Sequence, residues 1–492
     1  MIVESAALLG PIIITGIAPL FIWLCRKNIN AREGASFVAG ILTFLMVLSF
    51  TPQVLAGKIL VYHLFVILPG IEVKFCADGL TLIFAIVASF LWILATSYNI
   101  GYMRSLKEHA QTRYYFCFAV AIFGAEGVAM SGNVFTLYLF YEVITVFTYP
   151  LVAHHQDEEA YHGARKYLVY LMGTSKLFLL PAMILTYVLC GTLDFHLGDM
   201  VQGIFPATAD PILVQVTYFL YVAGLAKAAI MPLHNWLPSA MVAPTPVSAL
   251  LHAVAVVKAG VFSVCRILLS GFGVQTMSTL NLGEPTAYFA AFTIVVASAI
   301  ALTKDDLKAR LAYSTVSQLS YVVLGVSMLT PLAVTGGLAH IAHHAFSKIT
   351  LFFAAGAIYV ATHHKKISLL SGLGHRMPWT FGAFAVASLS MIGVPPVCGF
   401  VSKWYMVNGA VSAGYTVFMC ALLASTLLNT AYFAPIFYKA FFEKPAPGIA
   451  PEKYSEAPLS MVVPLCFTAA VSVFLGLYPE TFFQFINAFK GH

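Results

Sequence analysis

Residues 227–266 read KAAIMPLHNWLPSAMVAPTPVSALLHAVAVVKAGVFSVCR, and this stretch decides the fold class. The run is largely apolar, yet Lys227 and Lys258 lie within it, and Pro232 follows the first lysine after four residues. Proline removes an amide donor and breaks the helical ladder. At membrane depth, non-helical backbone is tolerated only where protein or a water-filled cavity surrounds it. The stretch therefore predicts a broken transmembrane helix followed by a second span.

The rest of the chain has the composition of a protein immersed in lipid. Of its 492 residues, 60% are hydrophobic and only 9% are charged, and the mean hydropathy is +0.87. Roughly a quarter of the residues are charged in soluble domains. Apolar runs of about 20 residues recur along the chain, the length needed to cross a bilayer, and they lack the alternation of barrel strands. We predict an all-α polytopic membrane protein.

The apolar runs predict about fourteen spans. The first run lacks the preceding positive charge and the cleavage site of a signal peptide, so we interpret it as a true span. Residues 55–78 are apolar but contain Pro69 and Gly70, which predicts an interfacial excursion or a hairpin. The predicted spans are 5–25, 35–54, 79–101, 114–131, 134–153, 167–190, 213–231, 245–269, 286–303, 311–329, 333–361, 380–406, 415–441 and 459–478.

Basic residues indicate the orientation of these spans. They concentrate in the loops after spans 1, 3, 5, 9, 11 and 13, whereas the loops after even-numbered spans contain only Lys58 and Lys74. The positive-inside rule places the Lys/Arg-rich loops in the cytoplasm. We therefore expect a protein of the cell inner (plasma) membrane with both termini outside. The residues of the basic loops are Arg26, Lys27, Arg32, Arg104, Lys107, Arg113, Arg165, Lys166, Lys304, Lys308, Arg310, Lys365, Lys366, Arg376, Lys439, Lys444 and Lys453.

Motifs for cofactors are missing from the sequence. The eight cysteines are scattered and form no C-x-x-C pair, so zinc, iron–sulfur and disulfide-framework sites lack their spacing. The sequence has neither a P-loop nor a G-x-G-x-x-G motif opening a helix. We expect no cofactor, no metal, no nucleic-acid partner and no redox active site in this chain. Any redox or nucleotide chemistry would belong to another chain.

Several charged residues fall inside the predicted spans. A charge at mid-membrane costs about 2.5–3.5 kcal/mol or more on insertion scales. The alternative is that some lie near the interface or extend toward it, and we favour this interpretation for Arg266 near the outer end of its span. For Lys227, Lys258 and Lys403, which have apolar sequence on both sides, we favour function. The others within spans are Glu126, Glu142, Lys176 and Lys348.

Glu142 lies in the middle of the span TLYLFYEVITVFTYP (136–150). Burial disfavours the charged form of an ionisable group, and a nearby group of opposite charge restores it. An acid and a lysine whose proton affinities depend on each other can act as a proton switch. The alternative is a static ion pair that holds two helices together.

Three titratable groups share one face of the span containing GGLAHIAHHAFSKITLFF (336–353). His340, His344 and Lys348 recur every four residues, so they stack on one side of a helix. Histidine titrates close to physiological pH, which suits a relay. Zinc is not expected there, because no carboxylate or cysteine completes a ligand set. His343 points elsewhere, and we assign it no role.

Two spans carry helix breakers beside a charge, which is a sequence sign of a transport site between repeated halves. One has Pro232 after Lys227; the other, MIGVPPVCGFVSKWY (391–405), has Pro395, Pro396 and Gly399 before Lys403.

A weak internal repeat accompanies these two breaks. Glu142, Lys176 and Lys227 are echoed by Gln318, Lys348 and Lys403, five spans later. An odd offset inverts the second copy in the membrane. We predict N-terminal spans 1–3 in residues 1–110, two inverted five-helix repeats in 111–270 and 284–444, each with a broken helix, and a final span in 445–492.

With these residues in view, the chain resembles the antiporter-type subunits of complex I, of Mrp sodium/proton antiporters and of membrane-bound hydrogenases, and is most similar to the D-type subunits of Mrp antiporters. The resemblance covers roughly residues 70–440, and the K-x4-P-x-H-x-WLP…APTPVSALLH block is its most specific part. The matching stretches are CADGLTLIFAIVASF, LYLFYEVITVFTYPL, the 227–266 stretch, LKARLAYSTVSQLSYV, HHAFSKITLFFAAGAIY and GVPPVCGFVSKWYM.

The resemblance implies a path for protons. Glu142 and Lys227 would form the paired switch, and Lys258 would be the next station. The central relay would consist of His340, His344 and Lys348, with Lys403 as the terminal group of the second half; a lysine there is similar to the Mrp D-type and complex I N-type subunits, whereas the M-type has a glutamate. The lateral helix that marks the L-type subunit is not expected. Further candidates for accessory positions are Lys176, His234 and Glu126. Glu126 matches no motif of the family, and it is either an exit-side group or a hydrogen-bond partner between helices.

Three function classes compete. The leading one is a proton- or cation/proton-translocating subunit, similar to the Mrp D-type subunits, with other membrane subunits as partners. The sequence leaves open whether sodium is transported. Its alternative within the class is a proton-pumping subunit of a complex I-like or hydrogenase complex linked to NADH, ferredoxin or quinone. A redox enzyme in its own right is disfavoured by the missing motifs. A passive scaffold predicts that removing Lys227 or Glu142 leaves ion transport intact.

Overall fold

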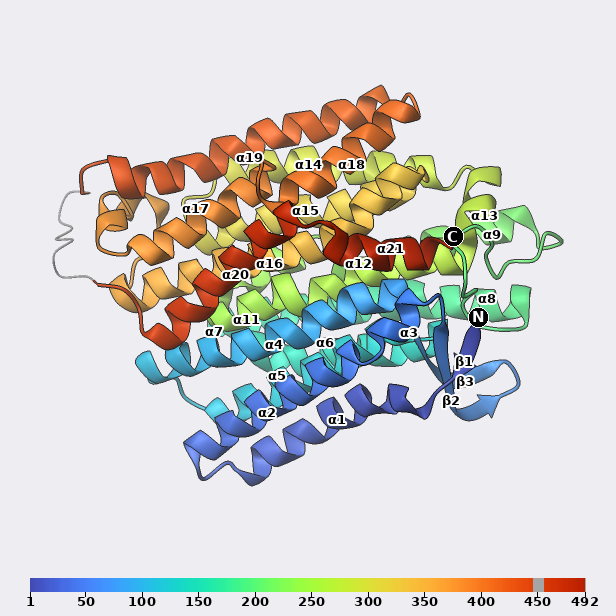
Figure 1. Ribbon diagram of the computed structural model, residues 1–492, viewed down its shortest axis with the longest axis horizontal. Helices are drawn as coiled ribbons and strands as arrows, with labels where there is room; N and C mark the ends of the chain where they lie inside the picture. The colour runs from blue at the N-terminus through green and yellow to red at the C-terminus, as the bar shows by residue number, and fades with distance from the viewer. Residues whose placement is uncertain (446–454, 492) are drawn as a thin grey trace.

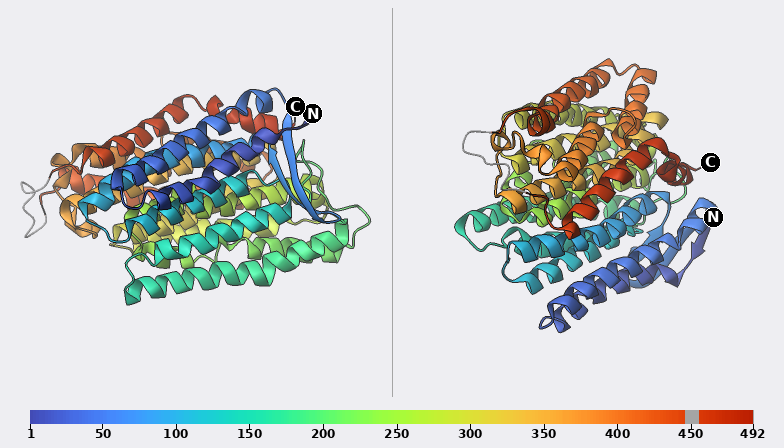
Figure 2. Two further views of the ribbon diagram at one scale, coloured as in Figure 1. Left: turned by 90° about the horizontal axis from the view of Figure 1, so that it is seen from below. Right: turned by 60° about the vertical axis from the view of Figure 1, so that its left-hand side comes forward.

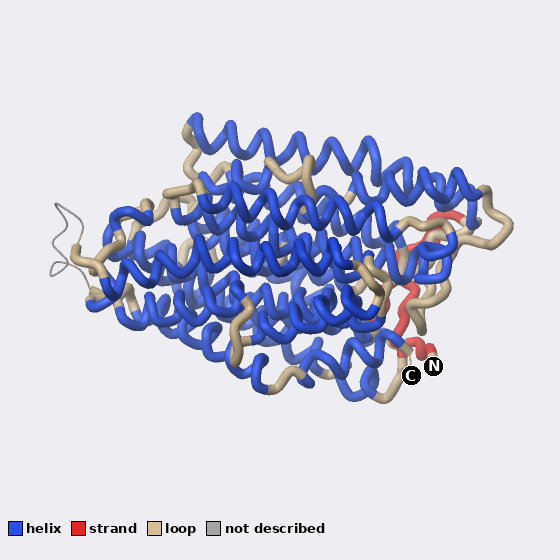
Figure 3. Tube along the Cα trace, turned by 90° about the horizontal axis from the view of Figure 1, so that it is seen from above, coloured by secondary structure: helices blue, strands red, loops and turns tan. Residues whose placement is uncertain are grey.

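Long helices run side by side along one axis of the molecule in the computed structural model, which describes residues 1–445 and 455–491 (Figure 1). Both termini and all three strands lie at one end, which we call the terminal end (Figure 3). The connections 106–110, 153–157 and 443–445 lie at the opposite end, which we call the loop end. Lys453, one of the predicted basic-loop residues, lies outside the described residues.

The first half of the chain supplies helices on one side of the bundle. They are α1 (Leu9–Leu24), α2 (Ile29–Leu48), α3 (Thr51–Leu55), α4 (Gly79–Ser105), α5 (Gln111–Ala129), α6 (Val134–Val152), α7 (Glu158–Thr174), α8 (Leu180–Cys190), α9 (Pro211–Gly224), α10 (Trp236–Ser239), α11 (Thr245–Ala249) and α12 (Val256–Arg266).

The second half continues the bundle toward the other side, so that α1 and α2 lie opposite α19 (Figure 2). Its helices are α13 (Gly273–Thr279), α14 (Gly283–Leu302), α15 (Leu307–Ser327), α16 (Pro331–Thr362), α17 (Pro378–Ile392), α18 (Cys398–Ser412), α19 (Thr416–Phe442), α20 (Leu459–Leu477) and α21 (Glu480–Lys490).

Short tighter or wider turns connect or interrupt these helices. The 3₁₀ turns are η1 (Ala6–Leu8), η3 (Ala226–Ala228), η4 (Ala240–Val242), η7 (Ile367–Leu369) and η8 (Leu373–His375). The π-helical turns are η2 (Ser175–Leu179), η5 (Leu250–Val254) and η6 (Ile267–Phe272). Turns of the π type are rare and occur frequently at functional sites; here η2 contains the in-span Lys176, and η5 and η6 flank the helix of Lys258.

Ten continuous helical stretches in the described part of the chain are long and apolar enough to cross a membrane. Four further predicted spans fall on α5, on α9 with η3, on α15, and on α17 with α18. The helical, polytopic architecture is thus confirmed. The count of fourteen crossings stays a prediction.

A small sheet at the terminal end amends the all-α prediction. The hairpin predicted in 55–78 is present, as β2 (Ile59–Leu68) pairs antiparallel with β3 (Ile71–Ala77). The first strand, β1 (Ile2–Glu4), adds to β2 in parallel. We expected no strand there, because three residues are too few to show a period in sequence.

A second unexpected element is α21, which follows the last predicted span. Its phenylalanines and Ile486 are buried at helical spacing. The helix packs on the start of α4 so closely that a Cβ at Gly79 would overlap the Phe485 carbonyl.

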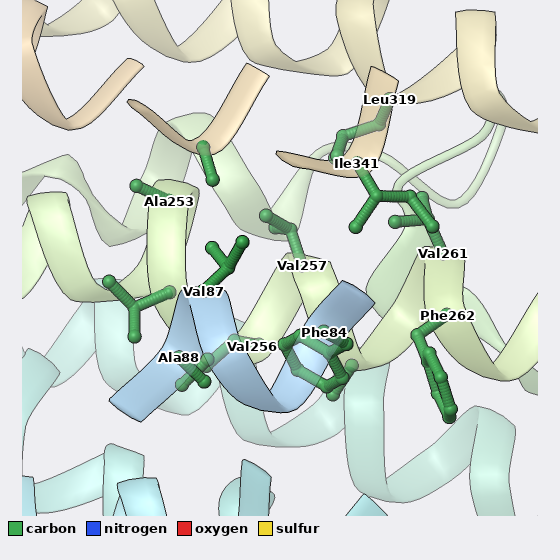
Figure 4. Packing of buried hydrophobic residues seen from close by; sticks show 14 of the residues in the cluster. Phe84, Val87, Ala88, Ala253, Val256, Val257, Val261, Phe262, Leu319 and Ile341 are labelled. Atoms are coloured by element: carbon green, nitrogen blue, oxygen red, sulfur yellow. The ribbon is translucent and has the colours of Figure 1, made fainter. Parts of the chain in front are cut away.

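The centre of the bundle is formed by α4, α12 and α16. Every residue of α12 is buried, and Figure 4 shows Val257 of α12 between Phe84 of α4 and Ile341 of α16. Lipid has no access to this core. Charged groups on α12 must therefore find their partners inside the protein.

Arg266 at the end of α12 illustrates this requirement: its side chain does not extend to the protein surface, and the interface position that we favoured for it stays a prediction. Its side chain is fully buried and forms two hydrogen bonds with Asp78, Nη1 to Oδ2 at 2.5 Å and Nη2 to Oδ1 at 2.8 Å. Asp78 also caps α4 by accepting a hydrogen bond from the Thr81 amide at 2.9 Å. The partner was missed because the sequence places Asp78 in a loop.

Candidate functional site

Glu142 on α6 is paired with Lys176 rather than with the lysine we expected. The Lys176 Nζ lies 3.6 Å from Glu142 Oε2 and donates to the Tyr138 hydroxyl at 2.5 Å. Ser175 donates to the other carboxylate oxygen. The side chain of Lys176 is 47% exposed and that of Glu142 is 15% exposed, so this pair lies at the lateral surface of the bundle.

Lys227 lies in η3, at the break in the helix that begins with α9. Its Nζ is fully buried and donates to the Tyr141 carbonyl at 2.7 Å and to Thr145 Oγ1 at 2.6 Å. The ammonium also lies 3.2 Å from the centre of the Tyr141 ring, a cation–π geometry.

The break around Lys227 is held by its neighbours. Trp236 Nε1 donates to the Ala226 carbonyl at 3.0 Å, and the Tyr141 hydroxyl accepts the Lys227 amide at 3.1 Å. These bonds replace those that an unbroken helix would make. Pro232 lies in the turn that follows η3, as the sequence predicted for a helix break.

Glu142 and Lys227 are therefore neighbours through α6 without a direct bond. Among the described residues, Lys227 bonds Tyr141 and Thr145, and Glu142 bonds Ser175 and Lys176. Tyr141 is adjacent to Glu142 in sequence. The predicted switch therefore consists of two separate contacts on α6: Lys227 contacts Tyr141, and Lys176 contacts the next residue, Glu142.

The second group of sites lies in the core, where Lys258 of α12 meets α16. Its Nζ lies 2.8 Å from His344 Nδ1, and both side chains are fully buried. The His344 and His340 rings are 5.9 Å apart between centroids. The shared face predicted for these histidines is confirmed by this geometry.

His340 bridges two other helices. Its Nδ1 lies 2.8 Å from Ser402 Oγ of α18, and its Nε2 lies 3.0 Å from Gln318 Oε1 of α15. The ring also stacks on Tyr321 at 5.5 Å. Gln318, which takes the place of an acid in the predicted second repeat, is therefore in direct contact with His340.

Lys403 lies beside the second break. Its Nζ donates to the carbonyl oxygens of Met391 at 2.6 Å and Ile392 at 3.1 Å, the last two residues of α17. The Met391 carbonyl also accepts Gln318 Nε2 at 3.4 Å and Asn429 Nδ2 at 3.1 Å. A helix end with free carbonyls is thus the anchor for the lysine.

The breakers predicted in this segment are located as expected. Pro395 and Pro396 lie between α17 and α18, and Gly399 lies near the start of α18. A Cβ at Gly399 would overlap the Ser390 carbonyl, and the Gly399 amide bonds Ser390 Oγ at 3.1 Å. Glycine is required there because two backbones touch.

Lys348 completes the set on α16. Its Nζ donates to Ser314 Oγ at 2.8 Å, and Ser314 also accepts the Tyr432 hydroxyl at 3.0 Å. The Tyr432 hydroxyl in turn lies 2.5 Å from Asn429 Oδ1. This chain of polar groups leads from Lys348 through α19 to the Met391 carbonyl that also holds Lys403.

Of the accessory candidates, Lys176 pairs with Glu142, whereas Glu126 and His234 do not join these contacts. Glu126 on α5 is fully buried, and neither carboxylate oxygen has a hydrogen-bond partner in the described part of the protein. His234 is half-buried in the turn before α10, with its ring 6.3 Å from Tyr313. His343 is buried, and its ring nitrogens have no hydrogen-bond partner among the described residues.

Several polar partners of the charged groups were missed from sequence. Tyr138, Tyr141 and Thr145 lie one turn apart on α6, and this spacing around Glu142 was the available signal. Ser314 stands one turn before Gln318 on α15 in the same way. His252, buried in η5 and stacked on Phe352 at 4.5 Å, was also missed.

Within the described residues, one group has the spacing to hold a metal ion: Glu108, His109 and His154 in the loops at the loop end. The buried lysines and histidines of α12 and α16 are not part of it. The expectation that the His340 face carries no zinc site therefore remains a prediction.

Known proteins are similar to this chain in sequence and in fold. Residues 131–429 match the family described as NADH:quinone oxidoreductase/Mrp antiporter, transmembrane. The chain is 34% identical over 412 residues to the N subunit of NADH-quinone oxidoreductase from Desulforudis audaxviator, with 80% of each chain covered. It is 31% identical over 473 residues to the A/B subunit of a probable K(+)/H(+) antiporter from Rhizobium meliloti, with 92% of this chain and 45% of that protein covered.

The chain spans about half the length of the antiporter A-type relatives it matches, 54% in the case of the A1 subunit of the Na(+)/H(+) antiporter from Staphylococcus haemolyticus. Two solved structures share the fold. A chain of the Mrp complex from a Dietzia species superposes with a TM-score of 0.86 at 20% identity, covering 99% of this chain and 97% of the other. A chain of the membrane-bound sulfane sulfur reductase, an archaeal respiratory membrane complex, gives 0.87 at 25% identity, covering 98% and 97%.

The resemblance drawn from the sequence motifs is confirmed by these matches. The family match covers more than half of the chain, and the N-subunit relative is matched over most of both lengths. The chain belongs to the NADH:quinone oxidoreductase/Mrp antiporter transmembrane family.

Proposed function

We propose that this chain is a proton- or cation/proton-translocating subunit of a multisubunit membrane complex, similar in role to the D-type subunits of Mrp antiporters. The observation that carries the proposal is a series of buried titratable groups in the core, from Lys258 and His344 through His340 to Lys403. Buried ionisable groups inside a membrane bundle are rare and mark ion pathways. The role requires no cofactor in this chain, because side chains carry the proton.

Some of the proposed stations are in direct contact, and others are separated by a gap that water would bridge. Lys258 and His344 are within direct transfer distance at 2.8 Å. The step from His344 to His340, with rings 5.9 Å apart, requires a bridging water. Glu142, Lys176 and Lys227 form the lateral end of the path and Lys403 its other end, with Lys348 and its hydroxyl partners beside the central histidines.

Substitution of the stations tests this path. Lys227→Ala, Glu142→Ala and Lys403→Ala should each reduce proton flux at least tenfold in proteoliposomes containing the complete complex, with wild-type amounts of the chain in the membrane. Lys58→Ala, at an exposed turn before β2, is the matched lysine control and should retain wild-type flux. Retained flux in the three variants would favour the passive scaffold.

Partner subunits are supported by the pair at the lateral surface. A lysine that is 47% exposed within a span would face lipid in an isolated chain, at a cost of about 2.5 kcal/mol or more for a charged side chain. We propose that a neighbouring membrane protein of the same complex covers Glu142 and Lys176. The relatives of known structure belong to an Mrp complex and to a respiratory membrane complex.

We also propose fourteen crossings and two inverted repeats, 111–270 and 284–444, between the N-terminal spans of 1–110 and the final span of 445–492. The order of helices supports it: α5, α6, α7–α8, the broken α9–η3 and α12 correspond to α14, α15, α16, the broken α17–α18 and α19. The halves differ in that Lys176 is exposed whereas Lys348 is buried. The protein would lie in the plasma membrane of a bacterium or archaeon, with both termini outside the cell.

The alternative role is a proton-pumping subunit of a complex I-like or hydrogenase complex. One observation favours this role: the N subunit of NADH-quinone oxidoreductase matches this chain over 80% of each length. Isolation of the native complex separates the roles. Iron–sulfur and flavin or nickel subunits in the preparation indicate a respiratory pump, and small antiporter-type membrane subunits alone indicate an antiporter, whose flux with Na⁺ or K⁺ identifies the cation.

A further inference from the structure

A group of metal-ligating side chains lies at the loop end, outside the helices that carry the proposed path. Glu108 and His109 belong to the connection between α4 and α5, and His154 and His155 directly follow α6. One ligand atom from each of Glu108, His109 and His154 lies within 4.8 Å of the other two. The His155 Nδ1 lies 3.8 Å from Glu108 Oε2.

The side chain of His154 supplies an independent observation that points to a bound ligand. Its imidazole is completely buried, and neither ring nitrogen forms a hydrogen bond with any described group. Its Nε2 comes to 3.5 Å from Glu108 Oε2, at the outer limit of a hydrogen bond. A buried polar atom without a partner costs free energy, and a bound cation would remove this cost.

The donor set matches the requirements of a transition metal ion. Two imidazole nitrogens and a carboxylate oxygen are ligands that Zn²⁺ accepts. Ligand atoms bonded at about 2.0–2.1 Å in a tetrahedral site lie about 3.3 Å apart. The Glu108–His154 separation of 3.5 Å already meets this value, and the exposed His109 can rotate to close the remaining distance.

The surroundings place charges of both signs near the site. Arg113 of α5 donates to the His154 carbonyl at 3.0 Å, which fixes the backbone of that histidine. Tyr114 packs its ring edge against the imidazole at 5.8 Å. Glu108 and His155 also line a polar cavity of about 490 Å³, together with Asp157, Glu159 and Lys308. The acidic groups of this cavity offset the charge of Arg113.

We propose that Glu108, His109 and His154 form a binding site for a divalent transition-metal ion of the Zn²⁺ class, with His155 or water as the fourth ligand. The site is distinct from the proposed proton path, whose lysines and histidines lie within the bundle. No sequence motif marks the site, because the ligands come from two loops some 45 residues apart and follow no local spacing.

Direct metal binding tests the proposal on the full chain. Purified, metal-free protein should bind one Zn²⁺ in competition with a chromophoric chelator. Co²⁺ in its place should give the visible absorption of a four-coordinate nitrogen and oxygen site, which the eight cysteines would not produce. His109→Ala, an exposed position that does not disturb folding, should lower the affinity at least tenfold, and His154→Ala and Glu108→Gln should do the same.

His162→Ala is the matched control. His162 is exposed and lines the same cavity, but it is not one of the three clustered ligands. Its variant should bind Zn²⁺ with wild-type affinity. The proposal is overturned if the wild-type chain binds no stoichiometric Zn²⁺, if His109→Ala and His154→Ala bind as tightly as wild type, or if His162→Ala loses as much affinity as they do.

Discussion

The buried cations Lys227, Lys403, Lys258 and Arg266 are held by three kinds of partner. Lys227 and Lys403 donate to backbone carbonyls at broken helices, Lys258 contacts a histidine, and Arg266 forms a two-bond pair with a carboxylate. A carbonyl or an imidazole can hold either a protonated or a neutral lysine, whereas an arginine–carboxylate pair stays charged. The three lysines are therefore suited to exchange protons, and Arg266 is suited to hold structure.

This distinction predicts that removing Arg266 alone destabilises the protein more than removing Arg266 together with Asp78. Arg266→Leu leaves the Asp78 carboxylate buried without its partner, which should lower the free energy of unfolding by about 3–5 kcal/mol. The double variant Arg266→Leu/Asp78→Leu removes both charges and should recover more than half of that loss. Thermal unfolding of the purified chain in detergent measures both. Equal destabilisation by the single and double variants would mean that Asp78 acts mainly as the cap of α4.

Glu108 predicts a pH dependence at the loop end. Burial acts to raise the pKa of Glu108, but the imidazoles of His154, His155 and His109 outweigh it, so that the pKa is lowered overall. A carboxyl with a lowered folded-state pKa stabilises the protein above its unfolded pKa of about 4.3 and loses this contribution as the pH falls through the folded value.

The corresponding measurement compares the Tm of metal-free wild type and Glu108→Gln from pH 7 to pH 3.5. Wild type should be the more stable at neutral pH, and the difference should vanish in the acid range. A difference that grows on acidification would contradict the sign of this shift.

Among the elements, the broken helices were predictable and their surroundings were not. Pro232, Pro395 and Pro396 marked the breaks because proline removes an amide donor, here beside a lysine within a span. Proline alone is a weaker signal, since Pro19 and Pro435 lie inside continuous helices. The π-helical turns η2, η5 and η6 carry no such local signal, since they depend on packing against neighbouring helices. For the same reason the family resemblance implied a pair of Glu142 and Lys227 but did not show that Lys176 lies beside the carboxylate.

The approach of α12 to the first break gives a prediction at this scale. A Cβ at Gly260 would overlap the Ala228 amide and lie 2.7 Å from Lys227 Cβ. Gly260→Ala should therefore displace η3, lower the free energy of unfolding by about 1–3 kcal/mol as overpacking does, and reduce proton flux with it.

Gly173→Ala on α7 is the matched control, because nothing lies within 4 Å of its added Cβ. Alanine favours a helix over glycine by about 1 kcal/mol, so this variant should be as stable as wild type or more so. Thermal unfolding and flux in proteoliposomes measure both variants. A fully active and stable Gly260→Ala would show that the contact between α12 and η3 is loose.

For the whole molecule, the position of the termini constrains the number of crossings. Both termini lie at the terminal end (Figure 1), so the chain crosses an even number of times if the helices span the bilayer along the long axis. Fourteen satisfies this condition, and thirteen or fifteen does not. The basic loops predicted to be cytoplasmic lie at the other end, as far as the described residues include them.

Chemical labelling tests this arrangement with one cysteine at each end. Lys58 is exposed at the terminal end and Lys366 is exposed at the loop end. Lys58→Cys should react with a membrane-impermeant thiol reagent added outside intact cells, and Lys366→Cys should react only in inverted vesicles, with the wild-type chain as the control for the eight native cysteines. Labelling of both from one side would contradict the nine crossings that the predicted spans place between Lys58 and Lys366. Reversed labelling would keep the fold but invert its orientation in the membrane. The loops that carry Glu108, His109 and His154 would then face the outside, and the proposed metal site would be exposed to extracellular Zn²⁺.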